Sequence, residues 1–273
     1  YNILRNENIK NVTLAESANR AIYYEVAANY DRTFGMHNIT GMFLFNRRDY
    51  VNLRNTDRTG SVPYRRQGIA GRASYNYLQR YFAEFNFGYN GSEQFPKGKR
   101  YGFFPSVSLG YVLTNEDFWN RNWWISNLKL RGSYGIVGNY NIGNYNHLAT
   151  IGTYNYVFNN GISAGRGTSG IGNADLTWET TKQLDFGVDL GLFNDRVFLV
   201  YDYYWKKTDG LLYQIDIPYS SGFENIQSNI GEFRFWGHEV GLETKNMTGK
   251  FKWNTSLNLT FNRNKAMKLD RKS

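Results

Sequence analysis

The residues of this chain that could do chemistry are mostly charged side chains placed at every second position. Asp185 and Asp189 alternate with apolar residues in one stretch, and Arg72, Glu84 and Arg131 do so in three others. Carboxylate and guanidinium groups in such a pattern can bind a polar ligand, or can pair with one another. We therefore treat these five residues as candidate binding residues, with mutual structural pairing as the alternative.

One glycine-rich segment matches a nucleotide-binding fingerprint. Gly165–Gly170 has the sequence GRGTSG and fits the pattern G-x-G-x-x-G. That pattern binds a dinucleotide only where a strand precedes it and a helix follows it, because the helix N-terminus meets the pyrophosphate. Here the segment lies within a long stretch rich in Gly, Asn and Tyr, which we expect to be a loop. We interpret it as loop sequence and expect no cofactor.

The histidines and cysteines give no indication of a metal site or of catalysis. His37, His147 and His238 are far apart, and the chain contains no cysteine. No second His or Cys lies at the spacing of metal ligands, and a disulfide framework is excluded. No Ser, His and Asp set is apparent. We therefore expect that the protein is not an enzyme and that it holds no metal.

The composition narrows the class of protein. The chain has 273 residues with 32 Lys and Arg against 23 Asp and Glu, and aromatic residues make up 18%. No run approaches the roughly 18 apolar residues that a transmembrane helix needs. The basic residues are scattered over expected loops rather than gathered on a helix, so nucleic acid is not an expected partner. Basic loops beside an anionic lipid surface explain the charge.

Apolar and polar residues alternate with a period of two in many segments, which is typical of β-strands with two different faces. Tyr81–Asn90, Gln183–Leu192 and Phe251–Asn262 are the clearest examples. At roughly 3.3 Å per residue and a tilt near 45°, about ten residues cross about 23 Å of membrane, which suits an outer-membrane barrel. Strands of a soluble sandwich are shorter. The expected strands are 22–30, 38–46, 68–77, 81–90, 104–113, 128–137, 181–193, 196–207, 230–245 and 250–262.

The connections between these strands alternate in length, which favours the same architecture. Barrels of the outer membrane have short periplasmic turns and long extracellular loops. The short connections are 31–37, 78–80, 194–195 and 246–249, and the long ones are 47–67, 91–103, 138–180 and 208–229. The connection 114–127 is longer than its short peers, and we predict a helical turn there, with Asn115 as N-cap and Glu116 and Asp117 at the positive end of the helix.

The alternation assigns a face to most side chains. Arg72, Glu84, Arg131, Asp185 and Asp189 have the parity of the inner wall of a barrel, where such groups can pair with one another or bind a polar ligand. Three tyrosines in the long loops are candidates to stack on sugar rings or peptide side chains, namely Tyr140, Tyr154 and Tyr213. His238 has the parity of the lipid-facing residues, unless a bulge near Phe235 breaks the local register.

Several segments, in order, resemble motifs of the SusC/RagA family of TonB-dependent outer-membrane transporters. Each is weak alone, but their ordered succession over roughly residues 20–265 is specific. The segments are 89–95 (YNGSEQF), 100–111 (RYGFFPSVSLGY), 116–118 (EDF), 128–135 (LKLRGSYG), 173–179 (NADLTWE), 183–189 (QLDFGVD), 202–208 (DYYWKKT), 229–231 (NIG) and 237–239 (GHE).

The resemblance implies a fold, a function and partners. The family fold is a 22-stranded barrel plugged by an N-terminal domain. Residues 1–273 would then be a partial barrel domain of about ten consecutive strands, with the plug and the closing strands elsewhere. The implied function is import of an oligosaccharide or oligopeptide across the cell outer membrane. The implied partners are a SusD-like surface lipoprotein, the TonB complex through a missing N-terminal region, and outer-membrane lipid.

Three other functions remain as alternatives at this point. A passive porin or adhesin-like barrel would have the same strand pattern without a plug or a TonB contact. A membrane-embedded hydrolase would need a catalytic set that sequence alone does not reveal. A soluble all-β binding domain would not need detergent.

Overall fold

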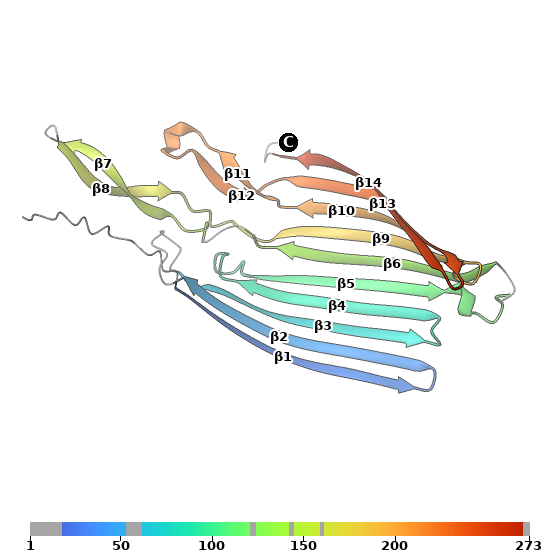
Figure 1. Ribbon diagram of the computed structural model, residues 1–273. Helices are drawn as coiled ribbons and strands as arrows, with labels where there is room; N and C mark the ends of the chain where they lie inside the picture. The colour runs from blue at the N-terminus through green and yellow to red at the C-terminus, as the bar shows by residue number, and fades with distance from the viewer. Residues whose placement is uncertain (1–17, 53–61, 121–123, 142–144, 159–160, 270–273) are drawn as a thin grey trace, which may run out of the picture.

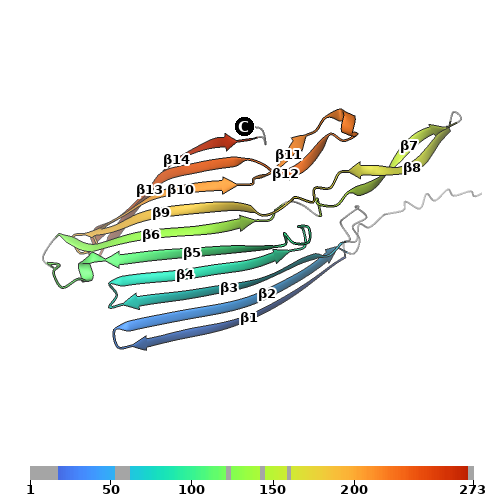
Figure 2. The ribbon, with the colours of Figure 1, turned by 180° about the vertical axis from the view of Figure 1, so that it is seen from behind.

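A computed structural model describes residues 18–52, 62–120, 124–141, 145–158 and 161–269. The main body is a ten-stranded antiparallel sheet with the order β1-β2-β3-β4-β5-β6-β9-β10-β13-β14. The sheet is curved and twisted, and two small hairpins project from one of its ends (Figures 1 and 2). None of the helices among these residues has the length and apolar character needed to cross a membrane.

Every one of the ten predicted strands is present, and most are longer than predicted. The strands of the main sheet contain 12 to 17 residues. Their bounds are β1 Asn19–Phe34, β2 His37–Asn52, β3 Tyr64–Tyr77, β4 Tyr81–Ser92, β5 Tyr101–Val112, β6 Ile125–Asn139, β9 Glu179–Leu192, β10 Val197–Asp209, β13 Glu232–Thr248 and β14 Lys252–Lys268. The prediction of an all-β antiparallel sheet is therefore confirmed.

The pairing register separates polar from apolar side chains over the whole sheet. One cross-strand row is largely polar and consists of Asp31, Thr40, Ser74, Glu84, Ser108, Ser133, Asp185, Tyr204, Gly237 and Asn262. The adjacent row begins at Arg32 and is otherwise largely apolar, with Ile39, Tyr75, Ala83, Leu109, Gly132, Phe186, Tyr203, His238 and Phe261. Because successive side chains of a strand point to opposite faces, we call these the polar face and the apolar face.

His238 lies on the apolar face, as its parity predicts. A register shift does fall close to Phe235, between Glu232 and Phe233, but the pairing of β13 with β14 then runs unbroken from Phe233 to Lys245, so His238 keeps this face. The imidazole Nδ1 lies 2.7 Å from the Tyr201 hydroxyl oxygen. A hydroxyl partner on the same face gives the polar ring a hydrogen bond in an otherwise apolar setting.

The short connection between β5 and β6 differs from its prediction. It contains a 3₁₀ helix, η1 (Leu113–Asn115), so Asn115 ends the helix and is not its N-cap. The Asn115 amide donates a hydrogen bond to the Gln79 carbonyl oxygen over 2.7 Å. Glu116 and Asp117 contact Arg80 at 3.0 and 2.5 Å. These acidic residues therefore bind the neighbouring β3–β4 turn, and the hydrogen bond that the Arg80 guanidinium donates to the Asp117 carboxylate raises the pKa of Arg80.

Two long connections contain strands that the sequence did not reveal. β7 (Thr150–Phe158) pairs with β8 (Gly161–Gly170), and β11 (Leu212–Asp216) pairs with β12 (Asn225–Asn229). The expectation that Gly165–Gly170 is loop is therefore wrong, since this segment lies in β8. A Cβ atom at Gly165 would lie 2.3 Å from the Tyr156 ring, so the glycine makes room for an aromatic residue of β7.

A small core fixes the long connections to their end of the sheet. Phe95 and Leu176 are fully buried and Trp178 nearly so, and they pack against Phe104, Tyr140 and Leu212. The Trp178 indole donates to the Arg100 carbonyl oxygen over 3.2 Å. The Asn229 side chain accepts from the Thr177 amide and donates to the Thr177 carbonyl oxygen, both over 2.8 Å. Part of the expected loop 138–180 is thus a packed structure.

The sheet predicts how residues 1–273 behave when expressed alone. Among the described strands, β1 and β14 each pair on one side only, so two rows of backbone groups lack sheet partners. Unpaired strand edges promote association with other chains and cannot be satisfied by lipid. We expect the isolated segment to aggregate, as measured by sedimentation and size-exclusion chromatography in detergent. A monodisperse monomer with a cooperative melting transition would contradict the barrel architecture.

Candidate functional site

The polar face carries all five charged residues predicted from the sequence. Its centre is an ion-pair cluster that joins β6, β9 and β10. Arg131 Nε lies 3.0 Å from both carboxylate oxygens of Asp189, and Arg131 Nη2 lies 2.8 Å from Asp189 Oδ1. The same Nη2 lies 3.0 Å from Asp202 Oδ1. Arg131 and Asp189 therefore form an ion pair with each other, which is the alternative to ligand binding that the sequence left open.

A glycine allows the Arg131–Asp202 contact to cross the intervening strand. Gly187 of β9 lies opposite Arg131 on one side and opposite Asp202 on the other. A Cβ atom at Gly187 would lie 2.2 Å from Asp202 Oδ1 and 2.7 Å from Arg131 Cζ. Because real Cβ atoms do not approach so closely, only glycine leaves room for this ion pair.

Arg72 and Glu84 belong to a second network on β3 and β4. Arg72 Nε donates to Asn86 over 2.9 Å and lies 4.0 Å from Glu84. Glu84 accepts hydrogen bonds from Ser74 and Asn86, each over 2.8 Å. The Arg72 side chain is 54% exposed and Glu84 35%, so both remain accessible to a ligand.

Three of the five predicted residues line a common depression on the polar face. Glu84, Arg131 and Asp185 contribute to it, together with Lys129 and other residues of β2 to β6. The depression has a volume of about 390 Å³. Arg72 and Asp189 lie outside its lining. The polar face thus offers a shallow, charged surface rather than an enclosed site.

The three predicted tyrosines do not form one site. Tyr154 lies in β7 and its hydroxyl donates to the Thr168 carbonyl oxygen over 3.0 Å. Tyr213 lies in β11 and is 59% exposed. Figure 1 shows the hairpins that carry them as separate projections. Tyr140 follows β6 and lines a pocket at the end of the sheet where the long connections lie.

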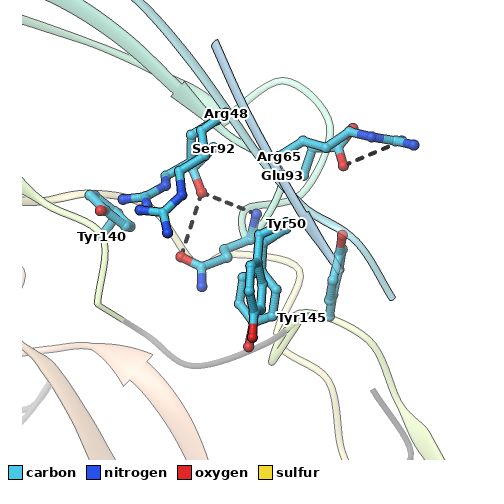
Figure 3. A pocket seen from close by; sticks show the side chains of 10 residues that line it. Arg48, Tyr50, Arg65, Ser92, Glu93, Tyr140 and Tyr145 are labelled. Atoms are coloured by element: carbon cyan, nitrogen blue, oxygen red, sulfur yellow. Dashed lines mark hydrogen bonds and ion pairs between the residues drawn. The ribbon is translucent and has the colours of Figure 1, made fainter. Parts of the chain in front are cut away.

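That pocket, which we call the rim pocket, is a site that the sequence did not reveal (Figure 3). It has a volume of about 330 Å³ and is rich in arginine and tyrosine. The ends of β2, β3 and β4 supply most of its lining. The lining residues are Arg48, Tyr50, Tyr64, Arg65, Arg66, Ser92, Glu93, Gln94, Tyr140 and Tyr145.

The strand register builds the rim pocket from two neighbouring rows on the polar face. Arg48 lies opposite Arg66, and Arg66 lies opposite Ser92. In the next polar-face row, Tyr50 lies opposite Tyr64, and their ring centroids are 6.0 Å apart. In the sequence, the pairs Arg47-Arg48 and Arg65-Arg66 are the feature that could have indicated this pocket. Only the strand register shows that Arg48 and Arg66 become neighbours.

The segment after β6 closes one side of the rim pocket. The Arg66 guanidinium carbon lies 5.0 Å from the centre of the Tyr140 ring, which is within cation–π distance. Tyr145 is buried, and its hydroxyl donates to the Pro63 carbonyl oxygen over 2.5 Å. Burial raises the pKa of Tyr145 further above its ordinary value, which favours the neutral hydroxyl that donates this hydrogen bond.

The fold of the chain matches that of a known protein family. The family described as TonB dependent receptor-like, beta-barrel, matches residues 4–272, so the chain belongs to that family. Barrels of this family are outer-membrane proteins. The resemblance to SusC and RagA is confirmed by the individual relatives.

Among curated proteins, the chain is 33% identical to TonB-dependent receptor P39 of Formosa agariphila over 88% of its length. It is 34% identical to TonB-dependent receptor SusC of Bacteroides thetaiotaomicron over 73% of its length. These alignments cover 25% and 20% of the two relatives. The chain therefore spans about a quarter or less of the length of these receptors.

Among solved structures, the chain is similar to a structure of the RagAB peptide transporter. The TM-score is 0.80 at 26% identity, and the match covers 92% of this chain and 30% of that one. The siderophore receptor PirA of Pseudomonas aeruginosa matches with a TM-score of 0.60 at 12% identity over 93% of this chain and 45% of that one. This second likeness extends to the fold alone.

The contact across Gly187 predicts a specific effect on stability. We expect Gly187→Ala in the complete receptor to lower the free energy of unfolding by about 1 kcal/mol, because the new methyl group forces the ends of the Arg131 and Asp202 side chains apart and removes their contact. Denaturant unfolding of the purified protein in lipid vesicles measures the change.

Gly132→Ala on the adjacent strand is the matched control for this substitution. A Cβ atom there would lie 3.6 Å from the Phe186 ring, an ordinary contact. Equal effects of the two substitutions would show that the crossing ion pair is not the reason for glycine at position 187.

Proposed function

We propose that the protein is a TonB-dependent transporter that imports a bulky nutrient across the outer membrane. The observation that carries the proposal is the sheet itself, which has one polar face and one apolar face and, over most of the chain, resembles SusC in sequence and the RagAB transporter in structure. A barrel built from this sheet encloses the polar face and turns the apolar face to lipid. The protein performs no bond chemistry in this role.

Exposed aromatic and aliphatic side chains support this orientation. Phe103, Val107 and Leu109 of β5 are 56%, 45% and 62% exposed on the apolar face. An apolar surface of this extent in water would promote association, whereas lipid covers it at no cost. In the proposed barrel of the 22-stranded type, the short connections lie in the periplasm and the long ones outside the cell.

In this proposal, the other parts of the transporter are formed by sequence outside residues 1–273. Residues 1–273 supply a partial barrel domain, and we assign the plug, the TonB contact and the closing strands to sequence outside this segment. A SusD-like surface lipoprotein would cap the barrel on the side of the long connections. The β7–β8 and β11–β12 hairpins project from that end and are placed to meet it (Figure 2).

The proposed substrates are oligosaccharides or oligopeptides. The related RagAB structure is that of a peptide transporter, which supports the oligopeptide class. The charged residues of the polar face, including Glu84, Arg131 and Asp185, are proposed to contact the substrate or the plug. Arg72 and Asp189 would support them, and Tyr140, Tyr154 and Tyr213 would meet the substrate earlier, at the outer end.

The requirement for TonB tests the proposed function. Cells that express the complete receptor should accumulate a labelled oligosaccharide or peptide substrate, and loss of TonB should reduce the uptake to the background of cells that lack the receptor. The same cells with an unrelated TonB-independent porin serve as the control. Uptake that persists without TonB would identify a passive barrel and overturn the proposal.

A further inference from the structure

Two arginines of the rim pocket, Arg48 and Arg66, lie side by side and form no ion pair with a carboxylate among the residues that the structure describes. Arg47 and Arg65 each contact Asp49, at 3.5 and 3.4 Å, and Arg65 also lies 3.8 Å from Glu93. Within the part of the chain that the structure describes, neither Arg48 nor Arg66 has a comparable ion pair. Their place directly opposite each other in the β2–β3 pair is unfavourable for two like charges, unless an anion lies between them.

The two arginines point to the same side of the sheet. Both belong to the polar face, whereas Arg65 extends away from Tyr140 toward Glu93 (Figure 3). Ser92 is buried beside Arg66, and its hydroxyl group already donates to Gln94 Oε1 and accepts from the Gln94 amide, so the two arginines are the donors that remain in this row. Two guanidinium groups are suited to a carboxylate or sulfate, because guanidinium donors match two oxygens at once.

The other lining residues offer flat ring surfaces. Tyr140 packs against the Arg66 guanidinium, and Tyr50 and Tyr64 form the adjacent row. An aromatic ring can stack against the apolar face of a sugar, while its hydroxyl reaches the solvent. The pocket volume of about 330 Å³ lies within the range of small-molecule sites.

We propose that the rim pocket binds the carboxylate or sulfate group of an acidic sugar unit within an oligosaccharide substrate. This inference rests on the proposed function, since it names the class of substrate that the transporter accepts. A sugar is favoured because the tyrosine rings beside the arginines offer flat surfaces on which a sugar can stack, and because addition of a peptide as a further strand is blocked, since β2, β3 and β4 each pair on both sides. They leave no free strand edge at the pocket with which a peptide backbone could pair.

Binding to the complete receptor in detergent, measured by isothermal titration calorimetry, tests the proposal. The probes are short oligogalacturonates, short sulfated galactan fragments, neutral galactan fragments of the same length and short acidic peptides. We expect a carboxylated or sulfated sugar to bind at least about tenfold more tightly than the neutral one, as one charge-assisted contact allows. The two acidic sugars distinguish carboxylate from sulfate as the recognised group.

Substitution of the two arginines assigns the binding to the rim pocket. Arg48→Gln together with Arg66→Gln should weaken binding of the acidic sugar about tenfold or more and leave the neutral sugar unaffected. Arg47→Gln is the matched control. It removes the same charge from the adjacent residue, which belongs to the apolar face and forms an ion pair with Asp49. Far-UV circular dichroism and the electrophoretic shift on heating show that each variant is folded.

Three results would overturn the inference. These are equal affinity for acidic and neutral sugars, preference for the acidic peptide alone, and an equal loss of binding in the Arg47→Gln control. None of them concerns TonB, so the inference can fail while TonB-dependent uptake stands. Conversely, tight binding of the acidic sugar without TonB-dependent uptake would keep the pocket and reject the transporter.

Discussion

The hydrogen-bond register of the main sheet is the constraint on which the rest of this structure depends. Side chains alternate between faces along a strand, so a slip of one residue would move every charged group to the apolar face. The register runs without a shift through β1 to β6 and from β9 to β10. The ion pairs of Arg131, the network of Glu84 and the rim pocket all follow from this continuity.

The ten long strands were predictable because each has its own alternation of polar and apolar residues. The two hairpins were not, since β8 is rich in glycine and β11 and β12 have five residues each. The sequence Asn115-Glu116-Asp117 is typical of the start of a helix, yet Asn115 is the last residue of η1. In the fold, Glu116 and Asp117 instead meet Arg80, a residue that is distant in sequence.

For the candidate sites, the sequence predicts which face of the sheet each residue occupies but not which residues contact one another. Parity placed Arg72, Glu84, Arg131, Asp185 and Asp189 on the polar face, but it could not show which of them bind each other. The rim pocket needs a register between strands and a return of the chain after β6, and neither is encoded in a single strand. Its arginines therefore look in sequence like other basic pairs, such as Lys206 and Lys207.

The core of Phe95, Leu176 and Trp178 has a consequence for protein engineering. The chain on either side of the β7–β8 hairpin is fixed near the sheet, since His147 lies 2.9 Å from the Gln94 carbonyl oxygen and Asn173 donates to the Gln227 carbonyl oxygen over 2.7 Å. The hairpin between these anchors is thus a module with two firm attachment points. Foreign epitopes or affinity tags grafted between Thr150 and Gly170 would be displayed at the end of the sheet without disturbing its register.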